Sequence, residues 1–217
     1  MSMPSSTAPA RAWPEPARFA LGLLLASGLS LSAAWLWGRA LVEATLPLAQ
    51  QTILWLDDRF AVLMLGIDHT HQDTVIRLRV NLVKLVLVGG QATYPDARGW
   101  LEVTTTVGAM LQPPVIAIGL AGAWPGRMAT RSLRVAVAAM LGVAFLLIDL
   151  PVTLHAYIWD MFHAHYDPQG FSPLLAWHEF MQAGGRLGMG VLLGISAAGT
   201  GSWLAERYRR ASTPSPG

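Results

Sequence analysis

Four long apolar runs, separated by more polar segments, set the pattern of this chain. They cover residues 19–38, 103–124, 135–156 and 187–205. As an α-helix, an apolar run of about 20 residues is long enough to cross the roughly 30 Å hydrocarbon core of a bilayer. The pattern therefore predicts a mainly α-helical membrane protein with four transmembrane helices. The pair Pro113-Pro114 interrupts the second run, and we expect neighbouring helices to accommodate a kink there.

The segment 39–102, between the first two runs, has a different pattern. Residues 39–58 have helical spacing, interrupted by Pro47, and either extend the first span outward or lie along the membrane surface. Residues 60–67 are a strand-like apolar run, and apolar and polar positions alternate along 74–88. These features predict a small extracytoplasmic α/β segment with an antiparallel sheet, in which 68–73 form a hairpin loop. A free edge of that sheet is a candidate to accept a partner strand.

Composition supports the membrane interpretation. The chain is 53% hydrophobic and 13% charged, whereas soluble domains carry about 25% charged residues. A net charge of +2 without a long basic run argues against nucleic acid as a partner. The chain has no cysteine, which excludes disulfides, thiolate metal sites and cysteine nucleophiles. The first apolar run lacks a convincing cleavage site, so we expect it to be retained as a helix rather than removed as a signal peptide.

Arginines in the short polar segments predict the orientation. The loop 125–134 contains three arginines and no acid, and the tails 1–18 and 206–217 also contain arginines. Lys and Arg mark the cytoplasmic side of short loops. We therefore expect a protein of the bacterial inner membrane with both termini in the cytoplasm. The loop 157–186, which is richer in acids, is then expected outside, together with 39–102.

Two short stretches, "IDHTHQD" at 67–73 and "DMFHAHYD" at 160–167, place two histidines one residue apart between aspartates. The candidate metal ligands are His69, His71, His163 and His165. In extended backbone, residues i and i+2 point to the same face, and imidazole with carboxylate suits zinc or copper. All four imidazoles would be available to one ion if the two stretches meet. The alternative, which this unspecific spacing favours, is that both are polar loops without a cofactor.

The apolar runs also contain a candidate polar cluster. Asp149 lies within the third run, Gln112 lies at a comparable depth in the second, and Arg186 begins the fourth. Thr153 follows Asp149 by about one helical turn. An acidic residue at the centre of a span raises the free energy of membrane insertion by roughly 2.5–3.5 kcal/mol, so we expect it to have a partner or a function. The four residues form either a binding or proton site, or a structural ion pair that fixes helix packing.

Glycines near the fourth run have a spacing that allows close helix packing. Gly184 and Gly188 are four residues apart, as are Gly190 and Gly194. Packing within the bundle and packing against another chain both remain open. Residues 176–186 are expected to form a short amphipathic helix at the membrane surface that turns into the fourth span at the glycines.

Catalytic motifs are not evident in the sequence. It contains no nucleotide-binding loop, no G-x-S-x-G and no H-E-x-x-H, so an enzyme is the least expected class. The strings "MLQPPVIAIGLAGAWP" at 110–125 and "WHEFMQAGGRLGMG" at 177–190 occur together with one leading span, a small outer β segment and an acid-bearing third span. This layout resembles small accessory membrane proteins associated with exosortases, of the exosortase H-associated type. The resemblance implies a helper in the sorting or surface attachment of exported proteins, with no catalytic residues to assign.

The expected function is therefore that of a non-catalytic accessory or assembly protein. Its expected partners are membrane lipid and another membrane or exported protein. The alternative is a membrane component that binds or transports a metal ion or protons through the outer histidines and Asp149.

Overall fold

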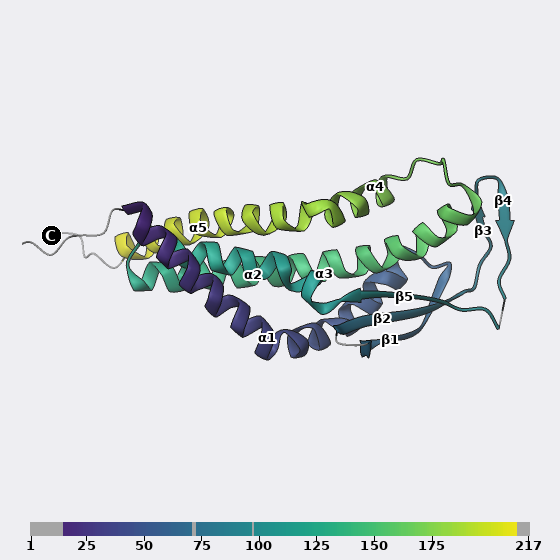
Figure 1. The fold of residues 1–217 in the computed structure, drawn as a ribbon, viewed down its shortest axis with the longest axis horizontal. Helices are drawn as coiled ribbons and strands as arrows, with labels where there is room; N and C mark the ends of the chain where they lie inside the picture. Colours follow the sequence, from purple (N-terminus) through teal and green to yellow (C-terminus); the bar gives the residue numbers. More distant parts are fainter. Residues whose placement is uncertain (1–14, 71–72, 97, 212–217) are drawn as a thin grey trace, which may run out of the picture.

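The computed structural model describes residues 15–70, 73–96 and 98–211 of the 217-residue chain. A helical bundle contains α1 (Glu15–Leu56), α2 (Val107–Ala123), α3 (Met128–Tyr166) and α5 (Arg186–Ala211). A shorter helix, α4 (Pro173–Phe180), joins α5 through the single turn η1 (Met181–Gly185). In Figure 1 the bundle is elongated, and a small β-sheet lies beside its right-hand part.

Within the described residues, three helical segments are long and apolar enough to cross a membrane: Pro16–Leu56, Met128–Tyr166 and Pro173–Ala211. The fourth apolar helix, α2, has 17 residues and is shorter than these three. It packs against α1, α3 and α5, so it completes the bundle. The predicted helical membrane-type fold is thus present, while a full crossing by α2, and with it the count of four spans, stays a prediction.

Helix α1 is continuous from Glu15 to Leu56 and passes through Pro47 without ending. It therefore extends beyond the predicted span 19–38 instead of breaking there. Its second half has buried residues at helical spacing, Val42, Ala49 and Ile53. They pack in the larger hydrophobic core, here called the main core, which side chains of the strands, α2 and α3 complete. Its first half exposes large apolar side chains, including Leu24, Leu29 and Trp35. That half has the character of a surface that faces lipid.

The second predicted run, 103–124, is divided between a strand and a helix. Residues 103–106 belong to strand β5 (Leu101–Thr106), and α2 begins only at Val107. The cause is local: three consecutive threonines favour strand, and the Thr106 hydroxyl caps the helix by accepting a hydrogen bond from Ala109 N at 3.2 Å. The prediction, which used the length of the apolar run alone, therefore placed the start of this helix four residues too early.

The predicted loops on either side of the third run are also shorter than expected. Helix α3 begins at Met128, inside the expected loop 125–134, and it continues to Tyr166, well inside the expected outer loop 157–186. It continues because Leu154, Ile158 and Phe162 repeat at intervals of four and are buried in the main core. As expected, residues 176–186 contain a short helix that turns into α5 at a glycine, where Gly184 has φ 113°.

The predicted small antiparallel sheet is confirmed. Strands β1 (Phe60–Thr70), β2 (Asp73–Leu82) and β5 pair antiparallel in the order β1-β2-β5. A separate hairpin pairs β3 (Val86–Val88) with β4 (Gln91–Thr93). The expected loop 68–73 is shorter, because the strand pairing extends to Thr70 opposite Asp73.

The sheet and the bundle share one hydrophobic core. On β2, Ile76, Leu78, Val80 and Leu82 point to one face and are buried with side chains of α1 and α3. The opposite face carries Arg77, which pairs with Asp68 at 3.0 Å and with Glu102 at 2.8 Å. Because the C-terminal halves of α1 and α3 supply the other side of this core, the sheet is held against the bundle and is not an independent domain.

The two ends of the molecule differ. In Figure 1 the start of α1, the turn between α2 and α3, and the end of α5 lie together at the left, while the sheet and α4 lie toward the right. Of the segments used to predict the orientation, the described parts, which include Arg18, the turn between α2 and α3, and the end of α5, lie at the same end. The orientation itself stays a prediction. We call the two ends the turn end and the sheet end.

Candidate functional site

The predicted polar cluster forms from three of its four residues. Arg186 Nε donates to Asp149 Oδ2 at 3.1 Å, and Arg186 Nη2 donates to Thr153 Oγ1 at 2.9 Å. The Thr153 hydroxyl in turn donates to Asp149 Oδ1 at 3.2 Å. Gln112 on α2 is only partly buried and, within the described residues, makes no hydrogen bond to these three.

Local backbone geometry places Arg186 in this cluster. The positive φ of Gly184 redirects the chain between α4 and α5, so that α5 starts with Arg186 turned against α3. Asp149 and Arg186 are each 4% exposed. Both oxygens of the Asp149 carboxylate accept a hydrogen bond, so the charges are neutralised inside the cluster. This closed geometry is that of a structural ion pair rather than of a site open to a ligand.

The two histidine stretches lie at opposite ends of the sheet. His69 on β1 is opposite Thr74 at the first end of β2, whereas His165 lines a cavity with Leu82 at the last end of β2. Leu82 is eight positions beyond Thr74 on the strand, which is about 26 Å at 3.3 Å per residue. One metal site formed from both stretches is therefore not present among the described residues, and His71 lies outside them.

His163 and His165 are also turned away from one another. Both belong to α3, where residues two apart differ by about 200° around the helix axis. The expectation that they share a face assumed extended backbone, and continuation of the helix removes it. The described residues contain no group of three or more His, Asp and Glu side chains able to hold a metal ion. His69 instead lies 3.2 Å from Arg39 Nη1, measured from its Nε2, and 3.4 Å from Thr74 Oγ1, measured from its Nδ1.

A second polar cluster, not foreseen from the sequence, joins the end of α1 to α3. The buried Asp57 carboxylate accepts from Arg59 Nε at 2.7 Å and from Arg59 Nη2 at 2.8 Å. His155 Nε2 lies 3.7 Å from Asp57 Oδ2 and accepts a hydrogen bond from Trp159 Nε1 at 2.9 Å. The Arg59 guanidinium covers the Trp159 ring at 4.8 Å, and Phe60 packs edge-on against the same ring. One part of this cluster could have been predicted from the sequence: His155 and Trp159 are four residues apart, so they lie on the same face of a helix and can form a hydrogen bond.

Arg59 controls the charge of Asp57. Burial alone raises the pKa of the Asp57 carboxyl, but hydrogen bonds and charge from Arg59 outweigh it and hold this pKa below its usual range. The same contacts raise the pKa of Arg59. The cluster is therefore an ion pair at neutral pH, and it fixes the point where α1 passes into β1.

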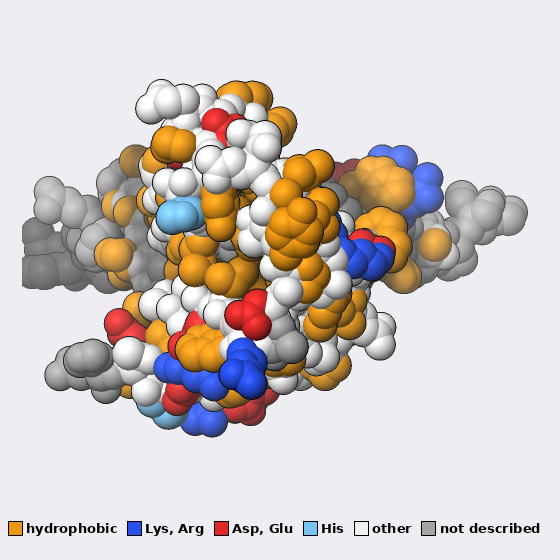
Figure 2. Space-filling view, turned by 90° about the vertical axis from the view of Figure 1, so that its right-hand side faces the viewer, with side chains coloured by type: hydrophobic (Ala, Val, Ile, Leu, Met, Phe, Trp, Pro, Cys, Tyr) orange, Lys and Arg blue, Asp and Glu red, His pale blue; other side chains and the backbone are white. Residues whose placement is uncertain are grey.

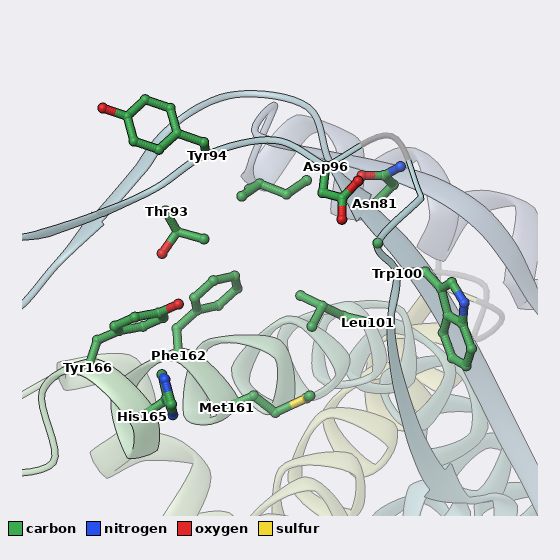
Figure 3. A pocket seen from close by; sticks show the side chains of 12 residues that line it. Asn81, Thr93, Tyr94, Asp96, Trp100, Leu101, Met161, Phe162, His165 and Tyr166 are labelled. Atoms are coloured by element: carbon green, nitrogen blue, oxygen red, sulfur yellow. The ribbon is translucent and has the colours of Figure 1, made fainter.

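The sheet end contains a cavity of about 420 Å³ between α3 and the ends of the strands. Phe162 and Tyr166 of α3 form one wall, and Leu101 of β5 lies opposite them (Figure 3). Figure 3 shows Thr93 pointing toward this wall, whereas Tyr94 points away at the rim. Asn81 Oδ1 and Thr93 Oγ1 are buried in the lining and have no hydrogen-bond partner within the described protein.

Apolar side chains are exposed around this cavity. Tyr94 is 72% exposed and Trp100 is 55% exposed, with the guanidinium of Arg79 stacked over the Trp100 ring at 4.8 Å. Leu87 on β3 and Phe171 between α3 and α4 are exposed as well, but they do not line this cavity. Figure 2 looks onto this end and shows hydrophobic side chains beside a group of basic and acidic ones. We call Tyr94 and Trp100, which both line the cavity and are exposed, the apolar rim.

A second cavity of about 520 Å³ lies between α3 and α4. Its lining is more polar and includes Tyr157, Asp160, His178 and Glu179. Gln182 bridges two of these groups, because its side-chain nitrogen contacts the Tyr157 hydroxyl and lies 3.1 Å from His178 Nε2. These contacts tie α4 to α3 and support the turn that leads to Arg186.

The fold and these sites define a class: a mainly helical, membrane-type protein with an antiparallel sheet packed at one end and an apolar cavity beside it. Comparison with protein-family models, with curated proteins and with solved structures finds no match to this chain. The functional assignment therefore rests on the geometry described above.

Proposed function

We propose that this chain is a non-catalytic accessory or assembly protein of the bacterial inner membrane, and that its sheet end binds another membrane protein or an exported protein. The observation that carries the proposal is the cavity with its apolar rim. Contiguous exposed apolar side chains mark interaction surfaces, and Tyr and Trp are enriched among residues that dominate binding. A partner segment that enters the cavity also brings backbone N–H groups. Asn81 Oδ1 and Thr93 Oγ1 can accept hydrogen bonds from them after small side-chain rotations.

The proposed topology places this surface outside the cytoplasm. With four spans and both termini cytoplasmic, the turn end lies inside and the sheet end lies outside. The partner is then a protein that is exported across, or inserted in, the same membrane. The resemblance to exosortase-associated proteins suggests a sorting or surface-attachment system as its setting.

The polar clusters support a structural over a catalytic or transporting role. Asp149, Thr153 and Arg186 form hydrogen bonds with one another, and Asp57 is neutralised by Arg59. A proton or ion carrier requires a group that exchanges with solvent, whereas both aspartates are almost fully buried. The apolar rim, in contrast, is exposed and open to a partner.

Site-specific photo-cross-linking in cells tests the proposal. A photoreactive amino acid replaces Tyr94 in one strain and Met128, an exposed residue in the first turn of α3, in the control strain. We expect position 94 to give a defined adduct with a membrane or exported protein that position 128 does not give. Mass spectrometry identifies the adduct. Absence of any adduct at 94, or the same adducts at both positions, would overturn the proposal.

A pair of variants tests whether the rim itself supplies binding energy. Trp100→Ala is expected to reduce recovery of the partner by about tenfold, because truncation of an aromatic side chain that dominates binding costs more than about 1 kcal/mol. Tyr208→Ala, which truncates an exposed aromatic near the end of α5, serves as the matched control and should leave recovery unchanged. Equal recovery with Trp100→Ala and with the unmodified chain would exclude the rim as the docking surface.

A further inference from the structure

A buried arginine at the turn end lacks the carboxylate that its counterpart at the sheet end has. Arg134 is 7% exposed. Its Nε donates to Ser202 Oγ at 2.9 Å, and its Nη1 donates to the carbonyl oxygens of Trp124 at 3.2 Å and Pro125 at 3.0 Å. All three acceptors are neutral. The guanidinium therefore keeps its full charge at the end of the bundle.

A second guanidinium increases this charge. Arg131 precedes Arg134 by three residues on α3, which places the two side chains on the same helix face. Arg131 Nε is buried and has no hydrogen-bond partner within the described protein. Among the described residues, no carboxylate lies within ion-pair distance of either arginine, and Glu206 on α5 is placed 4.0 Å from Arg210 instead. A buried guanidinium without a counter-charge is costly, so Arg134, with the partly buried Arg131 beside it, favours an anion.

The start of α3 adds to the same potential. Its N-cap residue, Arg127, supplies no side-chain hydrogen bond, and the first turn contains no acid. The first backbone N–H groups of a helix lack intrahelical acceptors and carry a partial positive charge. An anion beside Arg131 and Arg134 therefore meets both guanidinium groups and the positive end of a helix.

We propose that Arg131 and Arg134 form a binding site for the phosphate group of an anionic phospholipid. Hydrogen bonds from a guanidinium group to phosphate are charge-assisted and strong. Because Nε and Nη1 of Arg134 already donate to protein groups, Nη2 is the nitrogen that it would offer to the phosphate. The position selects a lipid as the source: the site lies where the apolar helix α2 ends, beside Trp124, whose ring packs edge-on against Phe19 at 6.4 Å. Aromatic residues at helix ends lie at headgroup depth, and basic pockets between helices on the cytoplasmic side bind anionic headgroups.

The inference is independent of the proposed partner surface, which lies at the other end, but it does depend on the helices lying in a membrane. Native mass spectrometry of the full chain in detergent, with a defined lipid added, tests it. We expect phosphatidylglycerol to be retained more strongly than phosphatidylcholine, which has no net charge. Equal retention of the two lipids would overturn the proposal.

Two variants of equal charge locate the site. Arg131→Gln is expected to lower phosphatidylglycerol retention by about tenfold, as for loss of one charge-assisted hydrogen bond. Arg207→Gln removes the same charge from the same end, where Arg207 stacks on Trp203 at 4.3 Å, and should leave retention unchanged. The same loss in both variants would mean that binding is unspecific and would overturn the proposal.

Added inorganic phosphate separates the two sources of the group. We expect phosphate to compete poorly at concentrations equal to those of the lipid, because it lacks the acyl chains that place the headgroup at the helix ends. Full displacement of phosphatidylglycerol under those conditions would assign the site to free phosphate and overturn the lipid assignment.

Discussion

Arg186 and Arg134 both lie between α3 and α5, at opposite ends of the bundle, but only Arg186 has a carboxylate partner. Arg186 extends from α5 to Asp149 on α3, whereas Arg134 extends from α3 to Ser202 on α5. The first contact neutralises its charge inside the protein. The second satisfies hydrogen bonds but leaves the charge in place. Two buried arginines of similar exposure therefore have different roles. Arg186 joins α5 to α3 through an ion pair, whereas Arg134 gives its end of the bundle a positive potential.

The largest expected effect comes from removal of the carboxylate. Asp149→Asn leaves Arg186 buried without a counter-charge, which costs about 3–5 kcal/mol when a buried pair is broken. Thermal unfolding in detergent measures the loss. The double variant Asp149→Leu with Arg186→Met should recover most of the stability, because it removes both charges together. A single variant as stable as the unmodified chain would mean that the pair is not structural, and would reopen Asp149 as a functional acid.

The two arginines should also differ when each is replaced by methionine. Arg186→Met leaves the Asp149 carboxylate buried and unpaired, with the same cost of about 3–5 kcal/mol. Arg134→Met leaves only neutral acceptors without this donor, the carbonyls of Trp124 and Pro125 and the Ser202 hydroxyl, at about 1–3 kcal/mol. The same unfolding measurement ranks the two. If Arg134→Met proved the more damaging, an acidic group or bound anion at the turn end would have to be part of the folded protein.

Glycine makes the contact at the turn end possible. A Cβ added at Gly201 would lie 2.7 Å from Arg134 Cγ and 2.8 Å from Arg134 Cα, so α5 would have to move. We expect Gly201→Ala to cost about 1–3 kcal/mol, as overpacking does. Gly199→Ala is the matched control, because nothing lies within 4 Å of a Cβ there, and it should be neutral or up to about 1 kcal/mol stabilising. Equal melting temperatures for the two variants would contradict the close approach of α3 and α5.

The glycine pairs named from the sequence divide in the same way. A Cβ at Gly190 would lie 2.8 Å from Ile116 Cβ, and one at Gly194 would lie 3.0 Å from Leu120 Cβ, so this pair packs inward on α2. Gly184 makes the kink before α5, and Gly188 meets nothing within 4 Å. The spacing was the same for both pairs, and only the neighbouring helix distinguishes their roles.

Features that depend on local pattern could be predicted from the sequence. The alternation along 74–88 indicated strand pairing, although the run is divided into β2, which ends at Leu82, and β3, which begins at Val86 in a separate hairpin. The glycines at 184–185 indicated the turn into the last helix. Asp149 and Arg186 could be matched because both carry charge at a similar depth in apolar runs. Each of these inferences needed only periodicity, or the cost of charge in an apolar environment.

Features that depend on distant packing could not. The continuation of α3 to Tyr166 requires the sheet that covers Phe162, and it is this helix that separates His163 from His165 around its axis. The contact between Asp57 and His155 joins residues 98 positions apart, through the extension of α1. Gln112 shared the predicted depth of Asp149, but depth does not fix which way a side chain turns around its helix.

The smallest expected effect concerns the second aspartate–arginine pair, Asp57 and Arg59, which extends the comparison to a partly solvated site. The Arg59 side chain is 38% exposed, so Asp57→Asn should cost about 1 kcal/mol, less than Asp149→Asn. Because the folded-state pKa of Asp57 is lowered, its contribution is fully present above the unfolded value of about 3.9 and is lost as pH falls through the lower folded value. The free energies of unfolding of the unmodified chain and the Asp57→Asn variant, measured as a function of pH, should therefore differ at neutral pH and converge in acid. A constant difference down to the acid end would mean that the Asp57→Asn substitution perturbs packing rather than charge.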